Sequence, residues 1–389
     1  MEFFTYVAVT ILETILRVLP FPCKTGLIRI GNPRRNSPVL VTCNYHLTVA
    51  RVKRSLRGEN VYLLVANSKG INVWCAAAGG HFTSHDVISV LKTSGIERLV
   101  DHRNAILPQL AATGVESQLI QKRIHWNIIW GPVYAKDIPR FIQNSFTKTP
   151  RMREVRFPLT QRIEMAAAWA FPISLVLAIA VLPFWRDIIP ALVIISWGVS
   201  FLLFLSFPLY SRWLRSEKKG RGFVFFDFGR GVFPLILTGM LILVGFSYTI
   251  FFAEFKWSSM LQWSFLSFII VLVFSIDLKG STPIFKSGLH EESLLKVVLD
   301  PQKCRGAGLC EDVCPRNCYD VDRDRHCAAM PRSERCVQCG ACIVQCPFDA
   351  LRFENPSGDI LTPETVRNFK LNLIGKRLVK GVKKFQVIE

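Results

Sequence analysis

Val61-Tyr-Leu-Leu-Val-Ala-Asn-Ser-Lys-Gly-Ile-Asn-Val-Trp-Cys-Ala-Ala-Ala-Gly-Gly80 is the stretch that sets the fold class of the N-terminal third. It begins with an apolar run rich in β-branched and aromatic side chains, which is typical of a buried strand. A polar turn around Lys69 and Gly70 follows, and the alanine-rich run after it favours a short helix. The stretch therefore predicts a strand, a turn and a helix, with Cys75 close to the start of that helix.

Similar elements lie on both sides of this stretch. Short apolar runs at 39–41 and 127–130 read as further strands, and stretches at 47–56, 85–93 and 116–123 have the periodicity of helices. Alternating strands and helices favour a mostly parallel sheet with helices on both faces. We therefore expect an α/β, Rossmann-like domain at residues 23–150, with its ligand beyond the carboxyl ends of the strands.

Four apolar segments follow, each of about the 20 residues that a membrane-spanning helix needs. Arg and Lys are frequent before the first segment, between the second and third, and after the fourth, whereas the other two loops hold only Arg186 and Lys256. This alternation follows the positive-inside rule and predicts a multi-pass protein of the cytoplasmic (inner) membrane with both soluble parts facing the cytoplasm. An even number of spans keeps both soluble parts on the same side of the membrane, whereas a fifth, poorly marked span would place them on opposite sides. We expect a four-to-five-helix all-α bundle at residues 165–278. The segments are 165–184, 188–209, 232–253 and 258–278.

The bulk composition agrees with a membrane protein in contact with lipid. Half of the 389 residues are hydrophobic and the formal charge is +19. A basic excess is typical of nucleic-acid, anionic-lipid or acidic-ligand binding, but here the charges flank apolar spans, so we expect no nucleic-acid partner. Residues 1–22 read as an amphipathic or apolar helix on the membrane or on the next domain, with a signal anchor as the alternative. Residues 356–389 read as a basic tail, a solvated or lipid-facing helix.

Nine of the 12 cysteines lie between Cys304 and Cys346, within a predicted α+β module at residues 295–355. Cys336-Val-Gln-Cys339-Gly-Ala-Cys342-Ile-Val-Gln-Cys346-Pro347 is the C-x2-C-x2-C-x3-C-P run of bacterial ferredoxins. Zinc is the alternative, because four-cysteine zinc sites also use C-x2-C pairs. The full run and its partner run favour iron–sulfur clusters, which require reduced thiolates and a cytosol-like compartment.

The partner run, Cys304-Arg-Gly-Ala307-Gly-Leu-Cys310-Glu-Asp-Val-Cys314-Pro315, has Ala307 in the second ligand position. In two-cluster ferredoxins the fourth cysteine of each run ligates the other cluster. We therefore expect one complete 4Fe–4S cluster and one set that lacks a ligand and holds either a 3Fe–4S cluster or a 4Fe–4S cluster completed by Cys318 or Cys327. The complete set is Cys314, Cys336, Cys339 and Cys342, and the incomplete set is Cys304, Cys310 and Cys346.

Cys75 is the candidate reactive residue of the α/β domain. The positive end of a helix dipole lowers the pKa of a thiol, so Cys75 is suited to be a nucleophile or a soft metal ligand. The alternative is a buried cysteine that behaves as a small apolar side chain.

The stretch Asn72-Val-Trp-Cys-Ala-Ala-Ala-Gly79 resembles the cap-helix signature, N-V/I-W-C-A-A/G-G-K, of the corrinoid protein family of microbial mercury methylation. The resemblance extends through 107–110, 131–139, 152–157 and the bundle to 277–283. In that family a separate dicluster ferredoxin is the redox partner, whereas here a similar module is fused to the same chain. A weaker resemblance reaches the corrinoid iron–sulfur protein of the acetyl-CoA pathway, which carries methyl groups from methyl-tetrahydrofolate.

This resemblance implies a corrinoid-dependent methyltransferase working under anaerobic conditions. Cys75 would be the catalytic residue and the lower axial cobalt ligand of a cobalamin-like corrinoid, and the rest of the cap helix would bind the corrin face. The thiolate would help methyl–Co(III) release its methyl group to a soft electrophile such as Hg(II), and the fused ferredoxin would return cobalt to Co(I). The cap-helix residues are Asn72, Val73, Trp74, Ala76 and Ala77.

Two features differ from the family pattern. The signature ends Gly-Lys, whereas Ala78-Gly79 stands here, and the sequence has no cysteine after Cys346 to match the cysteine pair at the end of the family's ferredoxin. Two alternatives to mercury methylation therefore stay open: methyl transfer to another acceptor, and a membrane iron–sulfur electron-transfer protein without methyl chemistry. The expected partners are a methyl-tetrahydrofolate-dependent methyl donor system and a low-potential electron donor.

Overall fold

The computed structural model describes residues 3–211, 295–355, 357–371 and 377–379, with a few positions between 257 and 282. The chain divides into two compact units. One comprises residues 1–19 and 156–291, and the other comprises residues 20–155 and 292–389. The α/β domain and the cysteine module therefore belong to one unit, although about 140 residues of sequence separate them.

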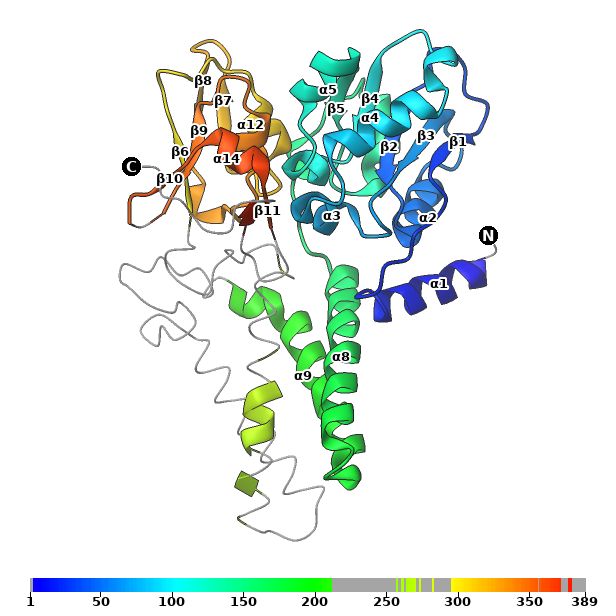
Figure 1. Cartoon of the computed structure of the whole chain (residues 1–389), viewed down its shortest axis with the longest axis vertical. Coiled ribbons are helices and arrows are strands. Elements are labelled where there is room, and N and C mark those ends of the chain that lie inside the picture. The colour runs from blue at the N-terminus through cyan, green and yellow to red at the C-terminus, as the bar shows by residue number, and fades with distance from the viewer. Residues whose placement is uncertain are drawn as a thin grey trace. The chain divides into compact units, whose positions relative to one another are not determined.

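A five-stranded sheet in the order β1-β3-β2-β4-β5 forms the centre of the α/β domain (Figure 1). The last four strands are parallel, and β1 pairs antiparallel with β3 at the edge. The predicted strands at 39–41, 61–65 and 127–130 are confirmed, whereas β1 and β4 were not predicted. The strands are β1 (Gly26–Ile30), β2 (Val39–Cys43), β3 (Val61–Ala66), β4 (Asn104–Leu107) and β5 (Asn127–Trp130).

Helices cover both faces of this sheet, as the sequence predicts. One face packs against α3 (Val73–Gly79), α4 (Ser84–Thr93) and α5 (Ser117–Ile124). The other face packs against α2 (His46–Ser55) and α6 (Ile138–Gln143). Short helical elements complete the domain: η1 (Ile96–Arg98), η2 (Gln109–Thr113), η3 (Ala135–Asp137) and α7 (Pro150–Arg153).

The cysteine module is α+β. Its main sheet is antiparallel in the order β10-β9-β6, and two further strand pairs, β7 with β8 and β11 with β12, lie beside it. The strands are β6 (Lys296–Leu299), β7 (Asp320–Asp322), β8 (Cys327–Ala329), β9 (Leu351–Glu354), β10 (Ile360–Leu361), β11 (Phe369–Leu371) and β12 (Arg377–Val379). The helices are α12 (Leu309–Val313), η8 (Ser333–Arg335), α13 (Ala341–Gln345) and α14 (Pro363–Asn368).

The predicted boundary at residue 356 is wrong, because the module continues beyond it. Strand β10 pairs with β9, and Val366 on α14 is buried in the core of the module. The guanidinium of Arg367 donates to the Cys346 carbonyl oxygen at 3.2 Å. The first part of the expected basic tail is thus a folded part of the cysteine module, held by apolar burial and by this hydrogen bond.

In the other unit, α1 (Phe3–Ile15) packs against α8 (Leu159–Val181). Helix α8 forms a hairpin with α9 (Ile189–Tyr210) through η4 (Arg186–Ile188), and the Ser200 hydroxyl donates to the Ala166 carbonyl oxygen at 2.8 Å. Within the described residues, two helical segments, 159–181 and 186–210, are long and apolar enough to cross a membrane, judged by length and composition alone. The predicted third span and most of the fourth lie outside the described residues.

Candidate functional site

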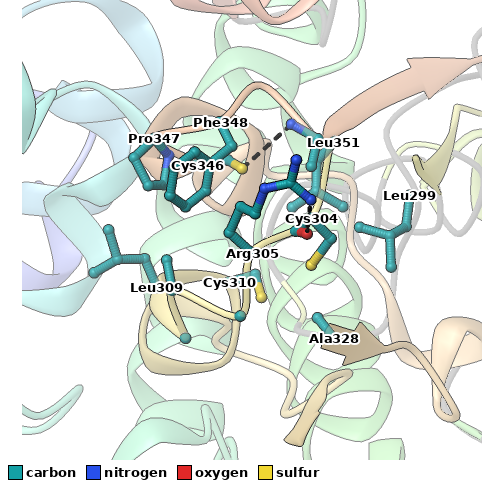
Figure 2. Close-up of a pocket in the computed structure, with 14 residues that line it drawn as sticks. Leu299, Cys304, Arg305, Leu309, Cys310, Ala328, Cys346, Pro347, Phe348 and Leu351 are labelled. Atoms are coloured by element: carbon teal, nitrogen blue, oxygen red, sulfur yellow. Dashed lines mark hydrogen bonds between the residues drawn. The ribbon is translucent and has the colours of Figure 1, made fainter. Parts of the chain in front are cut away.

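Three cysteines of the module line one cavity of about 350 Å³ (Figure 2). These are Cys304, Cys310 and Cys346, which the sequence assigns to the incomplete set. Ala307 and Ala328 lie on the same wall, and Leu299, Leu309 and Leu351 give the cavity an apolar lining. Apolar side chains around cysteine thiolates limit solvent access to the sulfurs and so influence a bound iron–sulfur cluster.

The other four cysteines of the two runs line a second cavity of about 310 Å³. The structure thus brings Cys314 from the first run beside the second run and Cys346 from the second run beside the first, which is the crossed grouping that the sequence predicts. The members of the complete set are Cys314, Cys336, Cys339 and Cys342.

Zinc sites and iron–sulfur clusters require different arrangements of the cysteine sulfurs. A single zinc ion draws four sulfurs to about 2.3 Å from one point, whereas the thiolates of a cluster stand apart at its corners. Among the described residues, no group of three or more His, Cys, Asp or Glu side chains is placed to hold a single metal ion.

Neither Cys318 nor Cys327 lies where a fourth ligand for the incomplete set would be needed. Cys318 is buried and lines the cavity of the complete set, where it hydrogen-bonds with Cys314 and lowers the pKa of that thiol to about 6. Cys327 is exposed on β8, and its neighbour Ala328 lines the first cavity instead. The expectation that either cysteine completes the first set is therefore not supported, and no fourth cysteine is among the described residues that line it.

Hydrogen bonds to sulfur reach both cysteine sets. The Tyr319 hydroxyl donates to Cys342 Sγ at 3.2 Å, and the Cys318 N–H donates to Cys314 Sγ at 3.3 Å. In the first set, the Ala350 N–H donates to Cys346 Sγ at 3.4 Å. Such donors stabilise negative charge on the sulfurs and so favour the reduced form of a cluster.

Cys75 lies in the first turn of α3, which begins beyond the carboxyl end of β3. The Asn72 side chain caps this helix and accepts a hydrogen bond from the Cys75 N–H at 3.1 Å. The Cys75 side chain is exposed, so its sulfur is available to an external metal and is not sealed in the core. This position agrees with the expected place of a ligand at the carboxyl edge of the sheet.

The neighbours of Cys75 on α3 have a different role from the one predicted. Val73, Ala76 and Ala77 are buried in the core of the domain, so their side chains anchor the helix and do not offer surface to a ligand. Trp74 is half-buried, and Cys75 is exposed. The packing of these three small apolar residues thus fixes one face of α3 against the domain core, whereas Cys75 remains exposed to solvent.

A buried amide, missed by sequence reasoning, holds the loop before α3. The Asn44 side-chain oxygen accepts hydrogen bonds from the Ser68 N–H at 2.8 Å, the Ser68 hydroxyl at 3.0 Å and the Gly70 N–H at 3.0 Å. Gly70 has φ +70°, and a Cβ there would lie 2.5 Å from the nitrogen of Pro22. The loop that delivers Cys75 is therefore fixed by hydrogen bonds and by close backbone packing.

The cysteine module docks on the α/β domain through a second buried amide, that of Gln345 on α13. Its Nε2 donates to the carbonyl oxygens of Ala112 at 2.8 Å and Val115 at 2.6 Å. Its Oε1 accepts from the Ser117 hydroxyl at 2.8 Å. Gln345 has no exposed surface, so these bonds replace all of its contacts with water.

Ion pairs extend the same contact. The Lys148 ammonium lies 3.0 Å from a carboxylate oxygen of Asp312 and donates to Gln109 Oε1 at 3.1 Å. Burial lowers the pKa of Lys148 to about 8, against the opposing effect of Asp312. Arg153 pairs with Glu311 at 3.1 Å. The two ion pairs join residues more than 150 positions apart, and for that reason the sequence pattern gave no sign of them.

Element η2 connects the two sites physically. It packs against α3 on one side and against α13 on the other. Gly114, at its end, lies so close to α3 that a Cβ would be 2.3 Å from the Ala77 carbonyl oxygen. Val313, Ala341 and the half-buried Cys339 belong to the same apolar core as Ala76 and Ala77. A cluster ligand and the helix that carries Cys75 therefore share one continuous packed interior.

Comparison with known proteins identifies two parts of the chain. Residues 17–142 match the CdhD family, described as the CO dehydrogenase/acetyl-CoA synthase delta subunit, and residues 331–352 match a 4Fe-4S binding domain. The chain thus contains a CdhD-type domain and a 4Fe-4S module.

Curated relatives match the same N-terminal part. The gamma subunit of the acetyl-CoA decarbonylase/synthase complex of Methanopyrus kandleri is 35% identical over 126 residues, which is 32% of this chain and 27% of that protein. The gamma subunit of Methanocaldococcus jannaschii is 33% identical over 131 residues (33% and 26%), and that of Archaeoglobus fulgidus is 30% identical over 129 residues (33% and 27%). The matched segment spans about a quarter of the length of these relatives.

Proposed function

We propose that this protein is a membrane-bound, corrinoid-dependent methyltransferase in which Cys75 would bind the cobalt of the cofactor and the docked iron–sulfur module would supply electrons. The observation that carries the proposal is the exposed thiol of Cys75, held on a capped helix at the carboxyl edge of the sheet in a CdhD-type domain. The relatives are subunits of complexes named for acetyl-CoA decarbonylase/synthase activity, which supports one-carbon chemistry for this domain.

The exposure of Cys75 supports its role as a ligand of this cofactor. Helix α3 presents the exposed sulfur of Cys75, while Val73, Ala76 and Ala77 fix the helix by core packing. When bound, a corrinoid would supply a cobalt centre that accepts and releases methyl groups. The chain would contribute the Cys75 thiolate as an electron-rich ligand, and Asn72 and Asn44 would keep that ligand in position.

The docked module accounts for the reducing equivalents that such a cofactor needs. Cys339 lies against the core that holds α3, and the contacts of Gln345 and Lys148 keep the module in place. A fixed donor shortens the electron path and removes the need for a diffusional encounter. An external low-potential donor would in turn recharge the clusters, and a methyl-tetrahydrofolate-dependent system would supply the methyl group.

The membrane assignment is supported by the apolar surface of the helical unit. Phe184 and Ile194 are 89% and 72% exposed, and Val176 on α8 is 65% exposed. Such surface is costly in water and is typical of contact with lipid. We infer a multi-pass protein of the cytoplasmic membrane whose CdhD-type domain and 4Fe-4S module both lie on the cytoplasmic side.

Hg(II) is the proposed methyl acceptor, because the Asn72–Ala77 segment resembles the cap helix of mercury-methylation proteins. Methyl transfer to another soft electrophile is the second candidate, favoured by the two departures from that family's pattern. The test is methyl transfer from methylated, corrinoid-loaded protein to Hg(II) and to a panel of other soft metal-ion electrophiles under anaerobic conditions. Cys75→Ala should lose transfer by at least about 100-fold while its iron–sulfur spectrum stays unchanged. Full activity in Cys75→Ala would remove the thiolate from the mechanism, and an electron-transfer role without methyl chemistry would then remain.

A further inference from the structure

The chain beyond β9 makes contacts with both parts of its compact unit. Strand β10 pairs with β9, and Val366 on α14 is buried in the core of the cysteine module. Directly after α14, strand β11 lies against α3, the helix that carries Cys75. Residues 357–371 therefore run from the interior of the cysteine module to the candidate site of the CdhD-type domain.

Arg367, in the last turn of α14, joins the two parts. Its guanidinium donates to the Cys346 carbonyl oxygen at 3.2 Å and to the carboxylate of Asp349, both in the module. Its Nε lies 3.7 Å from Oε1 of Glu116 in the CdhD-type domain. Only 20% of the Arg367 side chain is exposed, so solvent screens this ion pair less than it would screen a pair on the open surface.

Glu116 is held in place from its own side as well. Its N–H donates to the Ser84 hydroxyl at 2.8 Å, which ties the start of α5 to the start of α4. The next residue, Ser117, donates to the buried Gln345. An ion pair between groups on a fixed backbone loses less conformational entropy on forming than one between mobile surface groups. The contact between Arg367 and Glu116 is thus suited to fix one part against the other.

Cluster binding does not account for residues 357–371. The match to a 4Fe-4S binding domain covers residues 331–352, and the last cysteine of the sequence is Cys346. The segment thus contributes no thiol, yet its last strand lies on α3. Val366 shares its core with candidate cluster ligands such as Cys310 and Cys342, so the anchor of this segment lies in the part of the module that would surround the clusters.

We propose that residues 357–371 form a strap by which the cysteine module holds α3, with Arg367 as its positioning residue. A small module that binds metal through several cysteines folds around the bound group, so its interior is ordered only when that group is present. The strap therefore makes the order of α3, and with it the position of Cys75, depend on cluster loading. This role requires the clusters of the module but no corrinoid at Cys75, so it stands apart from the proposed methyl transfer.

Hydrogen exchange of α3 in the full-length, cluster-loaded protein tests the strap. Arg367→Gln should raise amide exchange of residues 72–80 by about three- to tenfold, whereas exchange of η2 should change by less than about twofold, because the bonds of Gln345 remain. Arg367→Lys keeps the cation and should stay within about twofold of the unmodified protein. Arg325→Gln, at a side chain of the module that is 84% exposed, is the matched control and should leave exchange unchanged. Equal iron content and equal EPR spectra show that each variant has folded.

Two further measurements separate a strap from a general loosening of the fold. Glu116→Gln removes the charge on the other side of the ion pair and should raise exchange of residues 72–80 by about two- to fivefold. After the iron has been removed with a chelator, the unmodified protein and Arg367→Gln should exchange alike in these residues, because the anchor of the strap is lost. Unchanged exchange of α3 in both Arg367→Gln and Glu116→Gln would overturn the proposal, as would an equal effect of Arg367→Gln with and without clusters.

Discussion

The side-chain carbonyl of Gln345 accepts two hydrogen bonds from Ser117, one from its N–H at 3.2 Å and one from its hydroxyl at 2.8 Å. Gln345 directly precedes Cys346, a candidate cluster ligand, and Ser117 begins helix α5 of the CdhD-type domain. Buried hydrogen bonds therefore join the 4Fe-4S module to the domain that carries Cys75, in addition to the covalent connection through the chain.

Gln345→Leu should loosen this docking. The substitution leaves the carbonyl oxygens of Ala112 and Val115 buried without their donor, which costs about 2–4 kcal/mol. Hydrogen exchange of residues 112–118 should quicken by at least about tenfold. Gln302→Leu, at an exposed position of the same module, is the control and should leave exchange unchanged. Equal protection in both variants would mean that Gln345 does not hold the interface.

Lys148 should make stability depend on pH. Its pKa falls from 10.5 to about 8 on folding, so the folded protein binds fewer protons than the unfolded chain between these values. Stability therefore rises with pH across this window, by up to about 1.4 kcal/mol per pH unit, relative to a variant without the amine. The free-energy cost of burying the charged Lys148 ammonium is fully present below about pH 8 and is absent above about pH 10.5.

Denaturant midpoints of the unmodified protein and of Lys148→Met, compared at about pH 7 and about pH 10, measure this effect. Relative to the midpoint of Lys148→Met, the denaturant midpoint of the unmodified protein should be higher at about pH 10 than at about pH 7. Lys122→Met, which removes an exposed amine, is the control and should show no such shift. A pH-independent difference for Lys148→Met would show that the buried ammonium keeps its ordinary pKa.

Asn44→Ala should release the loop that positions Cys75. The loss of three hydrogen bonds to Ser68 and Gly70 should raise amide exchange in residues 68–75 by about 10- to 100-fold. Retention of corrinoid during gel filtration should fall in parallel. Asn67→Ala removes one local bond to Lys69 and serves as the comparison. If both variants exchange alike, Asn44 is not the residue that orders this loop.

Tyr319→Phe should lower the reduction potential of the complete cluster. The phenol donates to Cys342 Sγ and stabilises the more negative, reduced cluster. Loss of about 1 kcal/mol of this stabilisation corresponds to about 40 mV for a one-electron couple. An EPR-monitored redox titration measures the change, with Tyr134→Phe in the CdhD-type domain as the control. An unaltered potential in Tyr319→Phe would mean that this hydrogen bond is absent or unimportant.

Sequence patterns predicted the parts of the fold that repeat or that are fully apolar. Strands β2, β3 and β5 were predicted from continuous apolar runs, and the crossed cysteine sets were predicted from spacing. Strand β1 was missed because it is a short, partly exposed edge strand, and β4 was missed because its apolar run begins with Ala105, a residue type that is depleted in strands. Both owe their conformation to their neighbours in the sheet more than to their own composition.

The candidate site was predicted only in part. The motif placed Cys75 correctly at the start of a helix. The burial of Val73, Ala76 and Ala77 depends on which side of α3 meets the sheet. A seven-residue helix is too short for its sequence periodicity to predict that side. The roles of Asn44 and Gln345 were missed for a related reason. Each is a lone polar residue whose partners are distant in sequence, so only the folded chain shows that its amide is satisfied.

The central claim is that the sulfur of Cys75 binds cobalt. Protein purified anaerobically and loaded with corrinoid should contain about one cobalt per chain, and X-ray absorption at the cobalt edge should show a sulfur neighbour. Cys75→Ala should lose that sulfur signal while its iron content and iron–sulfur EPR spectrum stay unchanged. Protein without cobalt, or an identical cobalt–sulfur signal in Cys75→Ala, would contradict the account.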